Sequence, residues 1–176
     1  MALFIGVDPG TIKMAVALFK DGRLVGTHLF AENPKEVMVE RIPSLAAQFS
    51  NWLADVMSTG ELTVIGFEDA YVGSRNLRVA IQLAQAVGFL KAIAWIHGVD
   101  ASFIFDVPVR KARKALCGRG AATKADVLEA ARKLALMDGY DCELSQDEAD
   151  AIAVAYCLWT QLAPFIREGK RCSSCF

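Results

Sequence analysis

Short apolar runs alternate with longer amphipathic stretches along the chain, and the first three runs predict strands. Residues 3–8 form an apolar run that ends in the turn signal Asp8-Pro9-Gly10. Residues 13–20 and 23–30 are rich in strand-forming side chains, and the turn dipeptide Asp21-Gly22 lies between them. We therefore expect the chain to open with a three-stranded antiparallel meander.

The rest of the chain alternates between helical and strand periodicity. Apolar side chains recur at helical spacing over residues 34–58, with Pro43 placed where it could kink or break that helix. Residues 62–68 and 101–107 predict two more strands. Thr123 and Ser145 are predicted N-caps, and Glu148 would complete a capping box with Ser145. Further helices are expected over residues 76–96, 108–116, 123–137 and 145–166.

This element order predicts an α/β fold in which a mixed five-stranded sheet is flanked by helices. The chain has 176 residues, of which 54% are hydrophobic, so it suits one domain with a full core. No Pro/Ser-rich linker divides it. We expect a single domain over residues 1–166 and a short tail over residues 167–176, with no apolar run continuous enough to span a bilayer.

The cysteines indicate a reducing compartment. There are five of them in a chain whose start lacks an export signal, so reduced thiols are expected in a cytoplasm, bacterial or that of a host if the gene is phage-encoded. Cys172 and Cys175 form a Cys-x-x-Cys pair in the tail. A solvated tail is favoured over a metal or redox site, because no further zinc ligands lie near in sequence.

Charge is distributed unevenly, although the net charge is only −1. The segment 107–125 contains six basic residues and no acidic one, which favours a phosphate-contacting face. The alternative is an ordinary solvated helix face, which would usually carry interleaved acids. The six are Arg110, Lys111, Arg113, Lys114, Arg119 and Lys124.

Four carboxylates are candidates for a metal site. Asp8 and Glu68 each end an apolar strand, at the sheet edge where α/β proteins bind ligands. Asp147 and Asp150 are three apart at the start of a helix, so they share a face. Each has a simpler reading, as a turn residue, a strand end or a partner of the helix dipole. Together they predict a site for Mg²⁺ or Mn²⁺, since clustered carboxylates repel one another unless a cation intervenes.

The order of these motifs resembles the RuvC family of Holliday-junction resolvases, within the RNase H-like superfamily. The resemblance spans residues 5–155 and so covers nearly the whole chain. The Gly-x-Gly-x-x-x-Lys and Asp-x-x-Asp-Ala blocks are its most specific parts. The segments that carry it are Ile5-Gly6-Val7-Asp8-Pro9-Gly10, Phe67-Glu68-Asp69-Ala70-Tyr71, Gly118-Arg119-Gly120-Ala121-Ala122-Thr123-Lys124 and Asp147-Glu148-Ala149-Asp150-Ala151-Ile152-Ala153-Val154-Ala155.

The resemblance implies roles for particular residues. It makes Asp8, Glu68, Asp147 and Asp150 the metal ligands and catalytic carboxylates. Lys124 matches a catalytic basic residue at the active-site rim, and Lys114 is matched to another. Tyr71 matches an aromatic position near the crossover point of the junction. Asp69 departs from the family, which often has Gln there. The expected DNA contacts are Tyr71, Arg75, Arg78, Arg110, Arg113, Lys114, Arg119 and Lys124.

The function implied by the resemblance is a structure-selective endonuclease of DNA recombination and repair. It would resolve four-way DNA by paired metal-dependent nicks, acting as a homodimer without membrane association. Two Mg²⁺ ions per site are expected, with Mn²⁺ able to substitute. The products implied are a 5′-phosphate and a 3′-hydroxyl.

The sequence leaves two other functions open and argues against a third. The chain could be an RNase H-like nuclease that cuts other branched or flap DNA. It could be a non-catalytic DNA-binding subunit of the same fold, although intact carboxylates oppose this. Sugar kinases and actin-like ATPases share the core fold, but they need further phosphate loops and a second domain for which 176 residues leave no room.

Overall fold

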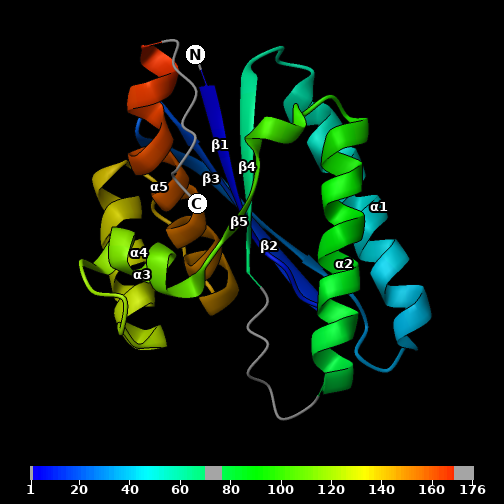
Figure 1. Cartoon of the computed structure of the whole chain (residues 1–176). Coiled ribbons are helices and arrows are strands. Elements are labelled where there is room, and N and C mark those ends of the chain that lie inside the picture. Colours follow the sequence, from blue (N-terminus) through cyan, green and yellow to red (C-terminus); the bar gives the residue numbers. More distant parts are fainter. Residues whose placement is uncertain (1, 70–76, 169–176) are drawn as a thin grey trace.

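A mixed five-stranded sheet forms the centre of the computed structural model, which describes residues 2–69 and 77–168. The strand order is β3-β2-β1-β4-β5. β1 pairs antiparallel with β2 and parallel with β4, which confirms the predicted meander followed by parallel strands (Figure 1). The strands are β1 (Ala2–Asp8), β2 (Lys13–Lys20), β3 (Arg23–Ala31), β4 (Leu62–Glu68) and β5 (Ile104–Val107).

Helices cover both faces of the sheet and enclose two cores (Figure 1). Successive β1 side chains alternate between these cores: Phe4 packs on the side of α5, and Ile5 and Val7 pack on the side of α1 and α2. α3 and α4 lie outside α5. The helices are α1 (Met38–Met57), α2 (Leu77–Ile96), α3 (Val109–Cys117), α4 (Lys124–Met137) and α5 (Gln146–Arg167).

The structure changes two of the predicted elements. The segment predicted as one strand from residue 101 begins as a 3₁₀ turn, Ala101–Phe103, because the Asp100 carboxylate accepts a hydrogen bond from the Ser102 amide at 2.8 Å. Pro43 lies inside α1 without breaking it, and the helix begins only at Met38. The residues before it form a turn instead, held by Arg41, whose guanidinium donates to two backbone carbonyls there at 2.8 Å.

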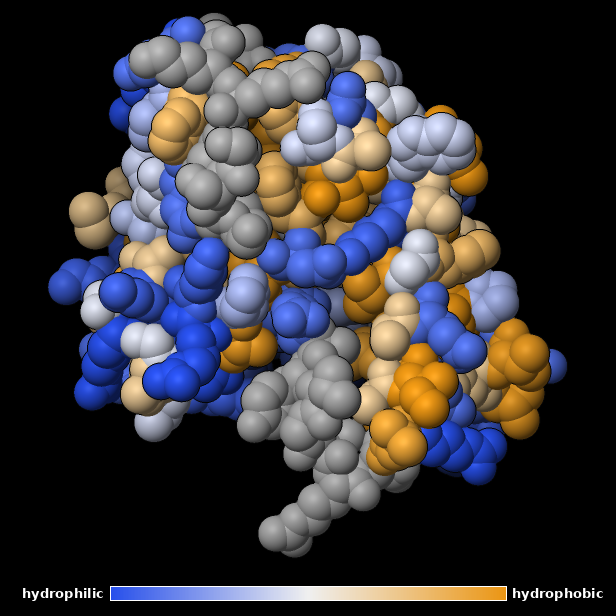
Figure 2. Space-filling view, viewed as in Figure 1, coloured by the Kyte–Doolittle hydropathy of each residue, from blue (hydrophilic) through white to orange (hydrophobic). Residues whose placement is uncertain are grey.

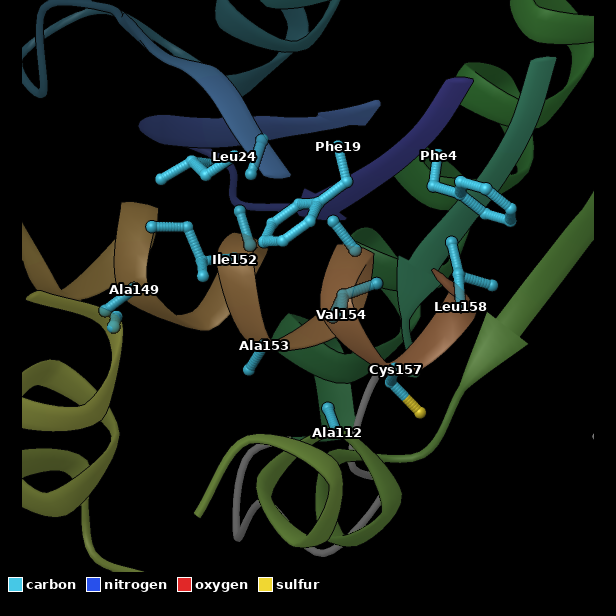
Figure 3. Close-up of a cluster of buried hydrophobic side chains, with 14 of the residues drawn as sticks. Phe4, Phe19, Leu24, Ala112, Ala149, Ile152, Ala153, Val154, Cys157 and Leu158 are labelled. Carbon is cyan, nitrogen blue, oxygen red and sulfur yellow. The ribbon is translucent and has the colours of Figure 1, made fainter. Parts of the chain in front are cut away.

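Two glycines at the middle of the sheet allow α5 to approach it closely. Gly6 on β1 lies beside Gly66 on β4 in the parallel register. A Cβ atom at Gly6 would collide with the backbone of α5 at Ala151 and Ala155, and one at Gly66 would stand 2.8 Å from Leu158. Figure 3 shows the result: α5 is wedged between the sheet and Ala112 of α3. The position of α5 is therefore fixed by backbone contact and not only by side-chain packing.

By length and composition, α2 and α5 are each apolar enough to cross a membrane, contrary to the expectation from the sequence. Burial explains α5, since 61% of its most apolar window lies inside the fold. In α2 only 22% of that window is buried, so the helix presents apolar side chains at the surface. One or two such helices are weak evidence for a membrane.

Candidate active site

Strand register brings Asp8 and Glu68 together. Val7 on β1 is paired with Phe67 on β4, so the next residue of each parallel strand, Asp8 and Glu68, falls at the same sheet edge. Both side chains are partly buried, and a side-chain hydrogen bond joins them. Asp69 turns away and is exposed, as strand alternation predicts, while its amide donates to the Val107 carbonyl at 2.9 Å.

The N-terminal end of α5 brings the second pair of carboxylates, Asp147 and Asp150, to the same place. Ser145 caps the helix and forms the predicted capping box with Glu148. Asp150 is only 6% exposed and accepts a hydrogen bond from the Gln146 amide at 3.3 Å. Asp147, half-buried, is close enough to Asp8 and Asp150 to raise the pKa of both. The structure thus gathers all four predicted carboxylates at one end of β1 and β4.

Burial and mutual repulsion raise the pKa of the clustered carboxyl groups. Burial, then the charges of Glu68 and Asp150, raise the pKa of Asp8 from 3.8 to about 9. The pKa of Glu68 is raised by burial and by Asp150, and the pKa of Asp150 is raised chiefly by burial. Asp8 therefore keeps its proton near neutral pH and donates it to the Glu68 carboxylate.

The chemistry of the donors suits a hard divalent cation, although the side chains do not yet form a complete ligand set. Carboxylate oxygens are the ligands that Mg²⁺ and Mn²⁺ prefer. A cation would reduce the repulsion between the carboxylates, which the proton between Asp8 and Glu68 now reduces. Among the described residues, no three Asp, Glu, His or Cys side chains stand close enough together to hold a metal ion. Binding one would require Asp8 to give up its proton.

Two basic residues act on the carboxylates: Arg113 of α3 and Lys124, the first residue of α4. Both lower the pKa of Glu68 and of Asp150. Arg113 also donates to the Ala122 carbonyl at 3.0 Å and so ties α3 to the loop before Lys124. The charge of Lys124 at the site agrees with its matched role, whereas Lys114 is exposed and it is Arg113 that contributes from α3.

The spacing of apolar residues along α3 accounts for the inward position of Arg113. Val109, Ala112, Arg113 and Leu116 follow the i, i+3, i+4, i+7 spacing of a buried helical stripe, and none of the four is exposed. Lys114 falls outside that stripe. An arginine on the inward face of an otherwise apolar stripe requires polar partners, and Arg113 has the Ala122 carbonyl as its hydrogen-bond acceptor and the carboxylates as opposing charges.

The Gly118-Arg119-Gly120 segment has a structural role between the two helices. Gly118 ends α3 in the left-handed conformation, with φ of 77°. Gly120 passes so close to α3 that a Cβ atom would lie 2.9 Å from the Arg110 carbonyl. Arg119 is paired with Asp126 at 2.9 Å, so tertiary structure supplies an acid that the basic segment itself lacks. This loop connects α3 to Lys124 at the start of α4.

The other predicted DNA contacts lie on the surface. Arg110, Lys114 and Arg119 are exposed around α3, and Figure 2 shows hydrophilic side chains gathered over α3 and α4. Arg78 is exposed in the first turn of α2. Tyr71 and Arg75 lie outside the described residues. These contacts stay predictions.

Family comparison identifies the chain. The family model described as crossover junction endodeoxyribonuclease RuvC matches residues 4–158. The chain belongs to this family. A Chlamydia trachomatis protein named crossover junction endodeoxyribonuclease RuvC is 29% identical over 168 residues, covering 93% of this chain and 94% of that protein. A Mycobacterium bovis protein of the same name is 31% identical over 159 residues, covering 87% and 79%.

Solved structures support the fold. A Thermus thermophilus RuvC structure covers 96% of this chain and 97% of its own, with a TM-score of 0.67 and 20% identity. T. thermophilus RuvC in complex with Holliday junction substrate covers 95% and 96%, with a TM-score of 0.69 and 21% identity. The expected RNase H-like mixed sheet and the expected family are both confirmed.

The raised pKa of Asp8 predicts how the stability of the metal-free protein depends on pH. Between about pH 4 and pH 9 the unfolded chain releases the Asp8 proton and the folded protein keeps it, so stability falls as pH rises. Asp8→Asn removes this loss and keeps a donor toward Glu68. In EDTA, we expect the variant to be more stable than the wild type at pH 8, on the order of 2 kcal/mol, and about equal at pH 4.

Urea unfolding at several pH values measures this difference. Asp55→Asn, an exposed carboxyl change on α1, is the control and should follow the wild type throughout. Parallel pH profiles for the wild type and Asp8→Asn would show that Asp8 is ionised in the folded protein.

Proposed function

We propose that this chain is a structure-selective endonuclease that resolves Holliday junctions by paired metal-dependent nicks in DNA recombination and repair. The observation that carries the proposal is the cluster of four carboxylates beside Arg113 and Lys124, in a chain of the crossover junction endodeoxyribonuclease family. The names of the relatives and the junction in the T. thermophilus complex support the same substrate.

Asp8, Glu68, Asp147 and Asp150 are proposed to hold two Mg²⁺ ions, with Mn²⁺ able to substitute. When bound, such a pair lowers the pKa of a water nucleophile and neutralises charge on the leaving 3′-oxygen. Asp8 and Glu68 stand on strands and provide the rigid half of the ligand set. Asp147 and Asp150 depend on how the first turn of α5 is placed.

The basic residues are proposed to supply charge around the reacting phosphate. Lys124 and Arg113 already act on Glu68 and Asp150, so they can offset negative charge that develops on the phosphate. Further out, Arg110, Lys114, Arg119 and Arg78 would contact phosphates and position the junction without reading sequence. Tyr71 and Arg75 complete the proposed DNA-binding set.

A homodimer would provide two sites for paired nicks, and the apolar surface of α2 supports such a dimer. α2 exposes large apolar side chains, and a groove between it and the start of α1 is lined by Val39, Ile42 and Phe89. Figure 2 shows hydrophobic residues gathered on this side of the molecule. Patches of this kind mark protein interfaces. The exposed α2 residues are Leu77, Val79, Ile81, Phe89, Trp95 and Ile96.

A cytoplasmic location is part of the proposal. The three cysteines in the described ranges, Cys117, Cys142 and Cys157, are free thiols, as a reducing compartment requires. The apolar surface of α2 is assigned to the dimer and not to a membrane, because α2 also packs on the core through Val87 and Leu90.

Cleavage of a synthetic four-way junction tests the activity. We expect Mg²⁺-dependent, symmetrically paired nicks that leave 5′-phosphates, and at least a roughly 100-fold slower rate in Asp8→Asn, because the variant lacks an anionic metal ligand. Labelled junctions, flaps and duplexes are compared in the same assay.

Asp55→Asn is the control and should cut like the wild type. Undiminished cleavage by Asp8→Asn would contradict the metal site. A wild type that prefers flaps would assign the site to a different branched substrate, and a wild type that binds junctions without cutting would indicate a non-catalytic subunit.

The basic surface predicts a salt-dependent interaction. Changing both Arg110 and Lys114 to Gln should weaken junction binding and reduce the slope of log affinity against log salt by about 2, since each lost phosphate contact contributes about 0.9. Fluorescence anisotropy across a salt series measures both quantities. Lys35→Gln, an exposed change before α1, should leave the slope unchanged; equal slopes in all three proteins would remove α3 from the interface.

The apolar surface of α2 predicts the oligomeric state. Phe89→Asp should raise the dimer dissociation constant at least about tenfold, because it buries a charge at the apolar contact. Light scattering after size-exclusion chromatography over a dilution series reports this constant. Val25→Asp, on the exposed face of β3, is the matched control. A monomeric wild type, or a Phe89→Asp dimer as tight as the wild type, would contradict the assignment.

A further inference from the structure

The connection between α4 and α5 covers the outer edge of the sheet. β3 is an edge strand, so some of its backbone N–H groups point away from β2. The amide of Leu24 donates to the Asp138 carboxylate at 2.7 Å, and the amide of Thr27 donates to the Tyr140 hydroxyl at 3.2 Å. The segment that leads into α5 is therefore fastened to β3 before the helix begins.

The side chain of Glu148 makes a third contact with β3, and both of its carboxylate oxygens accept hydrogen bonds. Oε2 accepts from the Ser145 amide at 2.9 Å and from the Ser145 hydroxyl at 2.7 Å. Oε1 accepts from the Thr27 hydroxyl at 2.7 Å, across 121 residues of sequence. The capping box needs only the bonds to Ser145, so the bond to Thr27 is an additional tie between the helix start and the sheet.

The position of Glu148 relates this tie to the active site. Glu148 lies between Asp147 and Asp150 in sequence, but at 100° per residue it projects from a different side of α5, toward β3. Gly6 fixes the helix further along, at Ala151 and Ala155. The first turn, which carries Asp147 and leads into Asp150, is thus held against the sheet by Glu148, because helix ends otherwise fray.

We propose that Glu148, held by Thr27 and Ser145, is a positioning residue that places Asp147 and Asp150 opposite Asp8 and so sets the affinity of the site for divalent cations. The inference rests on the proposed function, because it presupposes that these carboxylates bind metal. Its hydrogen bonds occupy both carboxylate oxygens, so Glu148 is assigned to placement and not to coordination.

Thr27→Val tests the tie while leaving the capping box intact, since valine keeps the β-branched shape and lacks the hydroxyl. In calorimetric titrations of the protein with Mn²⁺ alone, we expect about tenfold weaker binding than in the wild type, the usual effect of losing a partner behind metal ligands. Thr27→Ser, which keeps the hydroxyl, should bind within about twofold of the wild type. Glu148→Gln should weaken binding at least as much as Thr27→Val.

Hydrogen exchange provides a readout that needs no metal. In Thr27→Val, the amides of Glu148 and Ala149, which bond to Ser145, should exchange faster than in the wild type, while those of residues 152–158 keep their protection. Tyr140→Phe is the matched control, because it removes both contacts of the Tyr140 hydroxyl, with the amide and with the hydroxyl of Thr27, but leaves the bond between Thr27 and Glu148. It should lower the unfolding midpoint without changing the Mn²⁺ affinity.

The outcomes separate this inference from the proposed function. Wild-type Mn²⁺ affinity in Thr27→Val, with the wild type binding normally, would overturn the positioning role and leave the metal site standing. A wild type that binds no Mn²⁺ would overturn the metal site, and the positioning role with it. If Glu148→Gln fails to fold, Thr27→Val and its exchange profile decide the matter, since that change removes only the contacts of the Thr27 hydroxyl, with Glu148 at 2.7 Å and with the Tyr140 hydroxyl at 3.3 Å.

Discussion

The contact of α5 with the glycine-backed middle of β1 and β4 is the constraint on which the rest of the structure depends. Gly6 and Gly66 leave no side chain between the sheet and Ala151, Ala155 and Leu158, so the helix backbone rests almost directly on the strands. The N-terminal end of this helix lies beside the carboxyl ends of β1 and β4, where Asp147 and Asp150 meet Asp8. The chemistry of the site follows from this packing.

The repulsion between the clustered carboxylates destabilises the folded protein, and other interactions in the fold offset this cost. Burial and mutual repulsion of the carboxylates oppose folding, and both raise the pKa of Asp8. The opposing charges come from a separate layer, α3 and α4, through Arg113 and Lys124. Burial of the long apolar stretch of α5 supplies the stability that allows such a cluster to persist.

The two proposed functions, DNA binding and dimer contact, lie on opposite sides of the sheet. The side of α3 and α4 is hydrophilic and basic around the carboxylates, whereas the side of α1 and α2 exposes apolar residues (Figure 2). The sheet between them ties both surfaces to one rigid support. A dimer formed through α2 would leave each carboxylate cluster facing solvent, which is the arrangement that paired cleavage of one DNA substrate requires.

Local sequence determined most elements of this protein, because apolar periodicity, Asp-Gly turns and the caps Thr123 and Ser145 act over a few residues. It also indicated the four carboxylates and the family, since strand ends and helix starts fall where those signals place them. Only the tertiary structure decided that Arg113 lowers the pKa of Glu68 and Asp150, that Asp126 pairs with Arg119, and that Thr27 holds Glu148. Each of these depends on how separate elements dock, which no local pattern encodes.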